Sequence, residues 1–451
     1  MLSPSKEILK QLSSIDPIDV WRILKGSGVK YVKFIIVDIH GRPRSQIMLV
    51  DAAKDILIGG MPFDGSSIPF YATVNKSDYV ALPDLRSVYI ESWNGGKIAD
   101  IFMNVLEGSD TPSPMDPRNI LMQTCQYIRE KGYAVKASVE IEYFLVKEVN
   151  GKPTLADPGV YFEGFNTQML LDAITDIVSS LEASGIVISK THHEVAPSQY
   201  EVNIGPFDPV KTGDSIIMFK ILAKDVATRH GLVATFMPKP FWGINGSGAH
   251  THLSIYNAKT GENLFLSTGK ITETCGYAIA GILNYAREMS LIVAPLVNSY
   301  KRLVPHHEAP TRITWGYANR STLIRVPAYK GKINRIEYRH PDPSFNPYLG
   351  LSCMIIAMME GIEKKMPLSD PTEDIAYELS GVKETPAHLG EAIEEFRKSI
   401  FTQQLPGELV KRFIQLKERE WSSYLEAVKK SWSETWNVIT DWEYEQYLHY
   451  A

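Results

Sequence analysis

Nine lysines and arginines lie between Lys301 and His340, against two glutamates, in a chain of 451 residues whose formal net charge is -5. Cations this close together repel one another unless an anion lies among them. Five of the arginines stand among aliphatic and aromatic residues, which a solvated basic face, the alternative interpretation, does not require: Arg302, Arg320, Arg325, Arg335 and Arg339. Because the arginine fork binds phosphate and carboxylate oxygens in pairs, the segment predicts a polyphosphate pocket.

The composition predicts a globular protein with a large core and two or more domains, since 44% of the residues are hydrophobic and 22% are charged. Because the positive charge is concentrated in one segment, we expect no nucleic-acid partner. The N-terminal residues contain no apolar signal core, and no apolar run is long enough for a membrane span. We therefore expect a cytoplasmic protein.

Cys125, Cys275 and Cys353 lie far apart in apolar patterns, which predicts reduced core cysteines.

Residues 1–113 predict a small β-rich domain that begins with short helices. Two helices and two hairpins are expected there: helices from Ser3–Pro4 and from Asp19 to Gly26 or Gly28, and hairpins that turn at 40–42 and 94–96. Residues 61–85 are rich in Gly, Ser and Pro, which predicts a long loop between the hairpins. A loop of this length inside a compact domain is more often functional than idle.

A Pro-rich break at 111–117 predicts a boundary, after which residues 114–451 form a larger α/β or α+β domain. Strand and helix patterns alternate within it: strands near 133–146, 187–189, 200–204, 232–236, 250–255 and 335–339, and helices near 117–131, 166–183, 214–230, 272–289 and 346–365. From about residue 385 the chain is predicted to be helical and charged.

Paired carboxylates in the second domain predict a metal site. Glu140 and Glu142 are two apart on an expected strand, so both leave the same face. Neighbouring carboxylates repel, and a divalent cation between them removes the repulsion, although a surface strand can carry the same pattern by chance. Glu194 and Glu201 flank a Pro-Ser turn that can bring both back to one point.

A histidine and one further acid extend this set. His250, His252 and Ser254 share one face of an expected strand, although His-x-His alone is more often a structural pair than a ligand set. Glu337 is the one acid between Lys330 and Arg339. Five glutamates and a histidine make an oxygen-rich set, which suits magnesium or manganese better than zinc or copper.

In order along the chain, the motifs FDGSSI, E-x-E, HHEV followed by Q-x-E, NGSGxHxH, NSYKRLVPxxEAP, NRSxxIRxP, RIExRxPDPSxNPYL and WExEQY cover nearly its whole length. This series resembles the type I glutamine synthetases of bacteria and archaea. The resemblance implies an α+β fold: a ubiquitin-like β-grasp domain over 1–113 and, over 114–451, a catalytic domain whose curved antiparallel sheet forms a half barrel with outer helices. It also implies twelve subunits in two rings of six, with active sites shared between neighbours.

The resemblance further implies two or more Mg²⁺ or Mn²⁺ ions per site, with ATP as co-substrate. One ion is assigned to Glu142, Glu194 and Glu201, and a second to Glu140, His250 and Glu337. Substrate-binding residues are Asn245, Gly246, His250, Arg302 and Arg339, with Glu308 on a flap. ATP-binding residues are His252, Ser254, Arg320, Arg325, Lys332 and Arg335. The ammonium site is assigned to Tyr161 and to Asp64 and Ser67 of a neighbouring subunit, and the catalytic residues are Asp64, Glu308, Arg320 and Arg339.

The implied reaction joins ammonia to the γ-carboxylate of L-glutamate through γ-glutamyl phosphate, giving glutamine, ADP and phosphate. The family's usual Pro-Gly-Tyr-Glu flap is Pro305-His306-His307-Glu308 here, which leaves open a γ-glutamyl ligase that uses an amine or polyamine. A common acidic residue shortly before HHE is replaced by Ser189. A non-catalytic structural or regulatory assembly is a second alternative, although such a protein is expected to have lost metal carboxylates.

Overall fold

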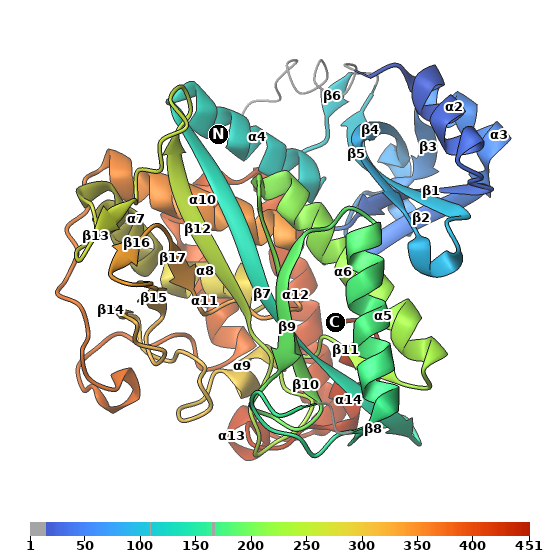
Figure 1. Ribbon diagram of the computed structural model, residues 1–451. Coiled ribbons are helices and arrows are strands. Elements are labelled where there is room, and N and C mark those ends of the chain that lie inside the picture. Colours follow the sequence, from blue (N-terminus) through green and yellow to red (C-terminus); the bar gives the residue numbers. More distant parts are fainter. Residues whose placement is uncertain (1–14, 109, 165–166) are drawn as a thin grey trace.

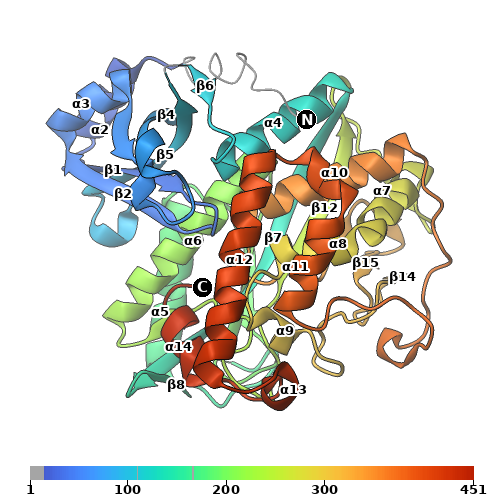
Figure 2. The ribbon, with the colours of Figure 1, turned by 180° about the vertical axis from the view of Figure 1, so that it is seen from behind.

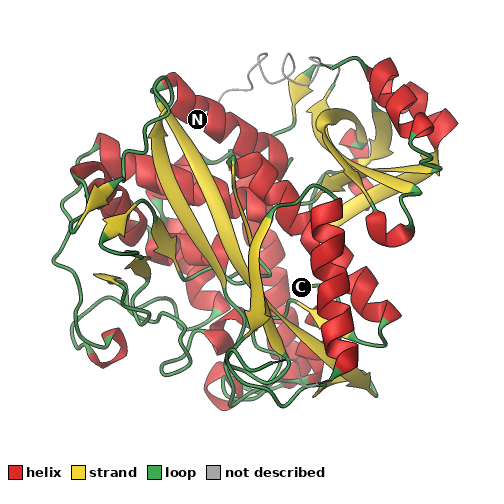
Figure 3. Cartoon of the chain, viewed as in Figure 1, coloured by secondary structure: helices red, strands yellow, loops and turns green. Residues whose placement is uncertain are grey.

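The computed structural model describes residues 15–108, 110–164 and 167–451 (Figure 1). The helix expected from Ser3–Pro4 lies outside the described residues, as does Asn166, the expected first residue of a later helix. Strands and helices alternate in the two parts of the chain (Figure 3), which confirms an α+β fold. None of the described helices is both long and apolar enough to cross a bilayer.

The N-terminal part is a mixed sheet with two helices beside it (Figure 1). Its elements are α2 (Pro17–Gly26), β1 (Tyr31–Val37), β2 (Pro43–Leu49), α3 (Val50–Gly59), β3 (Met61–Asp64), β4 (Asp78–Ile90), β5 (Ile98–Glu107) and β6 (Thr111–Pro112). The strand order is β2-β1-β5-β4-β3, with β6 beside β5, and of the described pairs in this sheet only β1–β5 is parallel. Both expected hairpins, β1–β2 and β4–β5, are confirmed.

The long loop expected over 61–85 is partly wrong. Its first residues form β3, which pairs antiparallel with β4 from Met61 opposite Ala81 to Asp64 opposite Asp78. The irregular segment therefore shrinks to residues 65–77, which include the short 3₁₀ turns 65–67 and 74–76. Helix α3 was not expected, although Val50, Ala53 and Leu57 have helical spacing and are buried.

A nine-stranded sheet forms the centre of the larger part, and Figure 1 shows it curling in front of a layer of helices. Its strand order is β14-β15-β17-β12-β7-β10-β9, with β8 and β11 beside β7. The strands are β7 (Tyr133–Val149), β8 (Lys152–Leu155), β9 (Ile188–His193), β10 (Gln199–Phe207), β11 (Val233–Thr235), β12 (Ala249–Asn257), β14 (Trp315–Tyr317), β15 (Ile324–Val326) and β17 (Ile336–Tyr338). The β14–β15 pair is parallel, so the sheet expected to be antiparallel is slightly mixed. A separate small pair joins β13 (Ser267–Thr268) to β16 (Lys332–Ile333).

The helices of this part lie mostly behind the sheet (Figure 2), except that α5 lies at its side, next to β9 and α6 (Figure 1). They are α4 (Pro117–Glu130), α5 (Gln168–Ala183), α6 (Pro209–Arg229), α7 (Glu273–Asn284), α8 (Ala286–Val293), α9 (Ser299–Arg302), α10 (Pro347–Glu363), α11 (Leu389–Lys398), α12 (Gly407–Val428), α13 (Trp432–Thr435) and α14 (Asp441–Tyr447). Helix α6 begins five residues before its predicted start because Asp208 caps it through the backbone N–H groups of Val210 and Lys211. The single helix expected over 272–289 is divided at Tyr285 into α7 and α8.

A buried arginine joins the two parts of the chain. Arg118, in α4, lies 2.9 Å from the Asp84 carboxylate of β4 and 2.8 Å from the Asp214 carboxylate of α6. A second contact comes from Asn346, whose side-chain amide donates to the carbonyl of Asp38 at 3.0 Å. These buried polar contacts fix the small sheet against α4, α6 and α10. Cys125, Cys275 and Cys353 are free, as expected.

Candidate active site

Strand pairing brings carboxylates and a histidine that are distant in sequence to one patch of the sheet. On β12, His250 lies opposite Glu140 of β7. On β10, Glu201 lies opposite Glu142 of β7. Glu337, on β17, lies opposite His252, two residues along from His250. Because side chains two apart on a strand share a face, the register alone collects these groups on one side of the sheet.

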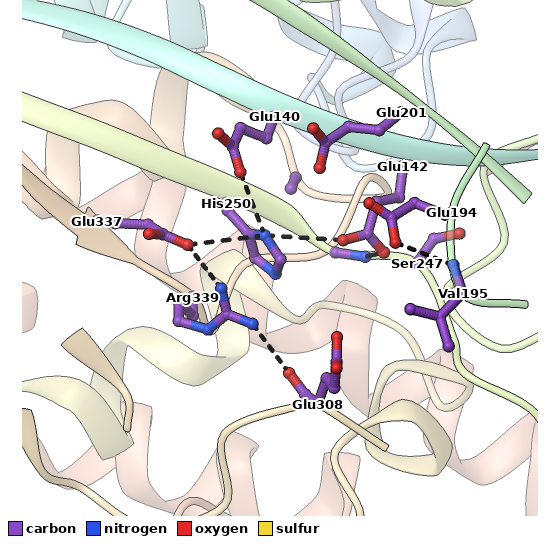
Figure 4. A network of polar contacts seen from close by, with 12 residues as sticks. Glu140, Glu142, Glu194, Val195, Glu201, Ser247, His250, Glu308, Glu337 and Arg339 are labelled. Atoms are coloured by element: carbon purple, nitrogen blue, oxygen red, sulfur yellow. Dashed lines mark hydrogen bonds and ion pairs between the residues drawn. The ribbon is translucent and has the colours of Figure 1, made fainter. Parts of the chain in front are cut away.

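His250 is the centre of the first cluster (Figure 4). Its Nδ1 lies 3.8 Å from a carboxylate oxygen of Glu140, 3.7 Å from one of Glu142 and 3.9 Å from one of Glu337. One donor atom from each of Glu140, His250 and Glu337 falls within 4.8 Å of the others, as a divalent ion requires. The family resemblance implied the same three residues as one ligand set.

The second cluster is arranged differently from the predicted group of Glu142, Glu194 and Glu201. Glu142 and Glu201 lie within 4.8 Å of His250, whereas Glu194 and Glu201 group with His192. The His192 ring lies 3.0 Å from Glu201 and 3.6 Å from Glu194. Sequence reasoning missed His192, although it stands two residues before Glu194 and so shares its side of the chain.

Carboxylate repulsion shows in the pKa values of the second cluster. Burial and the nearby Glu194 and Glu201 raise the pKa of Glu142 well above its usual range. Burial and Glu201 raise the pKa of Glu194 to about 7. Acids held this close without a cation keep protons, and a divalent ion removes the need for them. The oxygen-rich donor set therefore fits magnesium or manganese.

Two arginines hold Glu337. Arg339 donates from Nη1 to one carboxylate oxygen at 2.6 Å, and Arg325 contacts the other. Burial opposes the charge on Glu337, but Arg339, with help from His252 and Arg325, lowers its pKa to about 2. Arg339 also donates from Nη2 to the carbonyl of Glu308 at 3.2 Å, which connects the flap to this carboxylate (Figure 4).

Arg302 lies beside this cluster with its guanidinium fixed by backbone. It donates to the carbonyl of His340 at 2.8 Å and to that of Arg339 at 3.1 Å. A Cβ on Gly248 would stand 2.7 Å from an Arg302 nitrogen and 2.6 Å from His250 Nε2. A side chain at position 248 would therefore displace Arg302 or His250 from its present position. On the flap side, the His307 ring lies 3.2 Å from the Asn245 side-chain oxygen.

Two adjoining cavities open on these clusters. The first, of about 330 Å³, is lined by Glu140, Glu194, Glu201 and His192 together with Tyr161, Lys190 and Arg320, Arg325 and Arg335. The second, of about 310 Å³, is lined among others by Lys136, Ser189, Lys190, His252, Ser254, Tyr256, Asn334 and Arg335. The clusters and the basic segment thus meet in one place. Lys332, on β16, is exposed and lines neither cavity.

Asp64 and Ser67 do not lie beside the carboxylate clusters or the two cavities. Asp64 ends β3 and Ser67 lies in the 3₁₀ turn that follows it in the N-terminal part, and neither residue lines either of the two cavities. Asp64 accepts hydrogen bonds from the hydroxyls of Ser66 at 2.6 Å and Ser67 at 2.7 Å. The Ser66 and Ser67 bonds lower the pKa of this exposed carboxyl, which therefore stays ionised.

Comparison with known proteins gives this arrangement a family. Residues 114–438 match the family described as glutamine synthetase, catalytic domain, and residues 28–108 match glutamine synthetase, beta-Grasp domain. The chain belongs to the glutamine synthetase family. As a member it is an enzyme, a ligase, and the expected β-grasp domain and curled half-barrel sheet are confirmed.

Relatives of known name span almost the whole chain. The glutamine synthetase of Pyrococcus furiosus is 37% identical over 94% of this chain and 97% of its own length. That of Methanocaldococcus jannaschii is 37% identical over 95% of this chain and 97% of its own. A solved GmaS/ADP complex superposes with a TM-score of 0.82 at 28% identity, covering 95% of this chain and 99% of GmaS. Glutamine synthetase family members use ATP and divalent metal ions.

Proposed function

We propose that the chain ligates ammonia to the γ-carboxylate of L-glutamate, with ATP as co-substrate and γ-glutamyl phosphate as intermediate. The main support is the convergence of five glutamates and a histidine from β7, β10, β12, β17 and the β9–β10 turn beside an arginine-lined cavity. Glutamine synthetase is also the name of the relatives that are 37% identical over nearly the whole chain.

In this proposal, Glu142, Glu194 and Glu201 hold one divalent ion, and Glu140, His250 and Glu337 hold a second. His192 is a further candidate for the first ion because of its contacts with Glu194 and Glu201. Bound magnesium or manganese would neutralise charge on the phosphoryl group during transfer. The protein's part is to hold the carboxylates in place, and the buried Arg339–Glu337 pair does so for the second site.

Glutamate would lie between Arg302 and Arg339, with Asn245, Gly246 and His250 around it and Glu308 on the flap above. Two fixed guanidinium groups suit a substrate that carries two carboxylates. Closure of residues 305–308 would exclude water from the acyl phosphate, and the Arg339 contact with the Glu308 carbonyl already joins the flap to the site. Arg339 would also stabilise the charge that develops on the reacting carboxylate.

The nucleotide would occupy the two cavities. Ser254, His252 and Arg335 would contact the base and sugar end in the second cavity, while Arg320 and Arg325 would meet the phosphates in the first. Lys332 would need to move to take part, since it lines neither cavity. The ADP in the related GmaS complex supports a nucleotide site in this fold.

The reaction balances as two displacements. An oxygen of the γ-carboxylate attacks the terminal phosphorus of ATP, and ADP leaves, with Arg320 and Arg339 stabilising the transferring group. Ammonia then attacks the carbonyl carbon of γ-glutamyl phosphate, and phosphate leaves. Tyr161, whose pKa is raised by burial and by nearby Glu194, would help to hold ammonium. Asp64, ionised, would take its proton.

Asp64 and Ser67 line neither cavity, and β3, which Asp64 ends, lies in the N-terminal part, apart from the strands that carry the clusters (Figure 1). In this proposal they would therefore serve the site of another copy of the chain. We therefore propose shared sites in an oligomer, for which the type I resemblance suggests twelve subunits in two rings. The cytoplasmic location expected from the sequence stays a prediction.

The flap supports a second candidate, a ligase for a larger amine. His307 reaches Asn245, and the His306 ring packs on Tyr377 at 5.7 Å, so two imidazoles would border the proposed glutamate site. Phosphate release should be measured with magnesium, ATP and a panel of acids crossed with ammonium, methylamine, ethanolamine and putrescine. Glutamate with ammonium is expected to be fastest. Turnover with an amine but none with ammonium would replace the first proposal by the second.

A further inference from the structure

Lys190 lies where the two cavities meet. It lines both, a position that it shares with Glu140 and Arg335. Lys190 belongs to β9, at one end of the sheet order, whereas Arg335 stands just before β17, with β12, β7 and β10 between them. A ligand that extends from one cavity into the other must therefore pass both cations, which approach it from different parts of the curled sheet.

The strand directs the lysine side chain toward the carboxylates. Lys190 and His192 are two apart on β9 and share a face, and His192 pairs in register with Glu201 on β10. The Lys190 ammonium lies 3.3 Å from a carboxylate oxygen of Glu201 and 3.3 Å from His192 Nε2. Its position at the junction thus follows from the same register that gathers the metal-ligand candidates.

The two partners in the Lys190–Glu201 pair are not equally fixed. The Glu201 side chain is 4% exposed, whereas that of Lys190 is 50% exposed. The lysine ammonium can turn on its four-carbon stem, and the buried Glu201 carboxylate keeps its 3.0 Å contact with His192 when the ammonium moves. Little is lost when this ammonium leaves Glu201 for another anion.

Charge favours an anion at the junction. In the second cavity the charged lining residues are three cations, Lys136, Lys190 and Arg335, against the single carboxylate of Glu140. Lys190 and Arg335 are the two of these that also reach the first cavity, where Arg320 and Arg325 lie. A linear polyphosphate that runs from the second cavity to the first would meet Lys190 and Arg335 at the junction, while the first cavity's carboxylates, Glu140, Glu194 and Glu201, would face the proposed metal ions.

We propose that Lys190 is a further nucleotide-binding residue, which contacts the phosphate chain of a nucleoside triphosphate at the junction. This inference rests on the nucleotide site of the proposed function. The competing explanation is that Lys190 only neutralises Glu201, in which case its loss changes the binding of divalent ions and leaves the nucleotide itself untouched.

The test uses the full chain with Lys190→Met, which keeps most of the aliphatic stem, and Lys190→Arg, which keeps the charge. Lys364→Met is the matched control, because Lys364 is 54% exposed, is paired with Glu360 and lines neither cavity. Calorimetry measures ADP and adenosine binding to each protein, once with EDTA and once with magnesium. Removing one charged hydrogen bond to phosphate should raise the dissociation constant of ADP about tenfold in both conditions.

Lys190→Arg should remain within about threefold of the parent, and adenosine binding should not change in any variant. Unchanged ADP affinity in Lys190→Met with EDTA, with a loss only when magnesium is present, would overturn the proposal in favour of the Glu201 explanation. An equal loss of adenosine affinity would also overturn it, because adenosine has no phosphate. If the parent chain binds neither ADP nor ATP, the proposed function fails together with this inference.

Discussion

At the scale of single residues, the site depends on buried carboxylates whose charge is fixed by named partners. Glu337 is completely buried and contacts both Arg325 and Arg339. Glu142 and Glu194 stand in the opposite situation, since burial and neighbouring carboxylates raise their pKa values. Arginines therefore keep Glu337 ionised, whereas Glu142 and Glu194 would need a bound cation to lose their protons at neutral pH.

Glu337→Gln should abolish turnover and one of the two proposed metal sites. Because the lost ligand removes several kcal/mol of charge stabilisation at the phosphoryl group, we expect phosphate release to fall by about a thousandfold or more. A manganese titration should lose one binding event and keep the other. The control is Glu148→Gln, a glutamate on the same β7 strand whose partner is His449. Full turnover in Glu337→Gln would contradict the ligand assignment.

His340 predicts a pH dependence of stability. Neither of its ring nitrogens has a hydrogen-bond partner within the described part of the chain. Burial, with Arg302 nearby, lowers its pKa to about 3. An unfolded imidazole titrates near pH 6.5, so the unfolded chain binds more protons between pH 6.5 and 3. The contribution of neutral His340 to folding is therefore complete above about pH 6.5 and is lost as the pH falls toward 3.

His340→Phe removes this titration. Between pH 7 and pH 5, the free energy of unfolding of the variant should fall by about 2 kcal/mol less than that of the parent. Urea unfolding at the two pH values measures the difference. His230→Phe is the control, since His230 is partly exposed and paired with Asp176 at 2.8 Å. Equal losses in His340→Phe and the parent would show that folded His340 takes up a proton in this range as readily as the unfolded imidazole does.

At the scale of elements, the strands that carry the site could be predicted because their residues alternate. The order of motifs gave the family, and the E-x-E and His-x-His spacings gave shared faces on β7 and β12. The turn between Glu194 and Glu201 was also expected, and it lies between β9 and β10. Periodicity thus identifies which side chains leave a strand together.

Elements that depend on distant contacts were harder to predict. Strand β3 contains Pro62 and was read as loop, and its pairing with β4 is settled by tertiary contact rather than by local preference. His192 was missed because its role depends on the distances to Glu194 and Glu201, which the sequence does not give. Lys332 was assigned to the nucleotide by motif alone, yet its short strand places it outside both cavities.

The C-terminal helix α14 supports the short helix α9 that carries Arg302. Glu443, fully buried, pairs with Lys301 at 2.5 Å and accepts a hydrogen bond from Asn298 at 2.8 Å. Asn298 in turn binds the backbone of Lys239, in the segment that leads to Asn245. Helix α14 therefore supports both α9, which carries Arg302, and the segment that leads from Lys239 to Asn245.

Glu443→Leu should destabilise the chain by about 3–5 kcal/mol, because it leaves the buried Lys301 ammonium without its carboxylate. The double variant Lys301→Met with Glu443→Leu should recover most of this loss, since it leaves no buried charge unpaired. Thermal unfolding measures both. If the double variant were no more stable than the single one, the pair would not be the source of the loss.

At the scale of the whole molecule, the N-terminal sheet and the catalytic sheet form one body, joined through Arg118 and Asn346. This rigid attachment keeps Asp64 away from the cavities of its own chain. The proposed chemistry needs an ionised base, so it requires a second copy of the chain at the site. In the proposed reaction, an oligomer would then be part of the active site rather than a means of stabilisation.

Mixing two inactive variants tests this arrangement. Asp64→Asn alone and Glu337→Gln alone are both expected to be inactive. When the two are assembled together, a site can combine the Asp64 of one chain with the Glu337 of another. Random assortment should then restore about a quarter of the parent activity. Phosphate release from co-expressed and purified assemblies measures it, and no recovery would place Asp64 in its own chain's site.

The most direct test of the account is a crystal grown with manganese and a non-hydrolysable ATP analogue, measured for anomalous scattering. The account predicts one peak among Glu142, Glu194 and Glu201, a second among Glu140, His250 and Glu337, and the phosphate chain beside both. Peaks elsewhere, or carboxylates turned away from the metal ions, would contradict it.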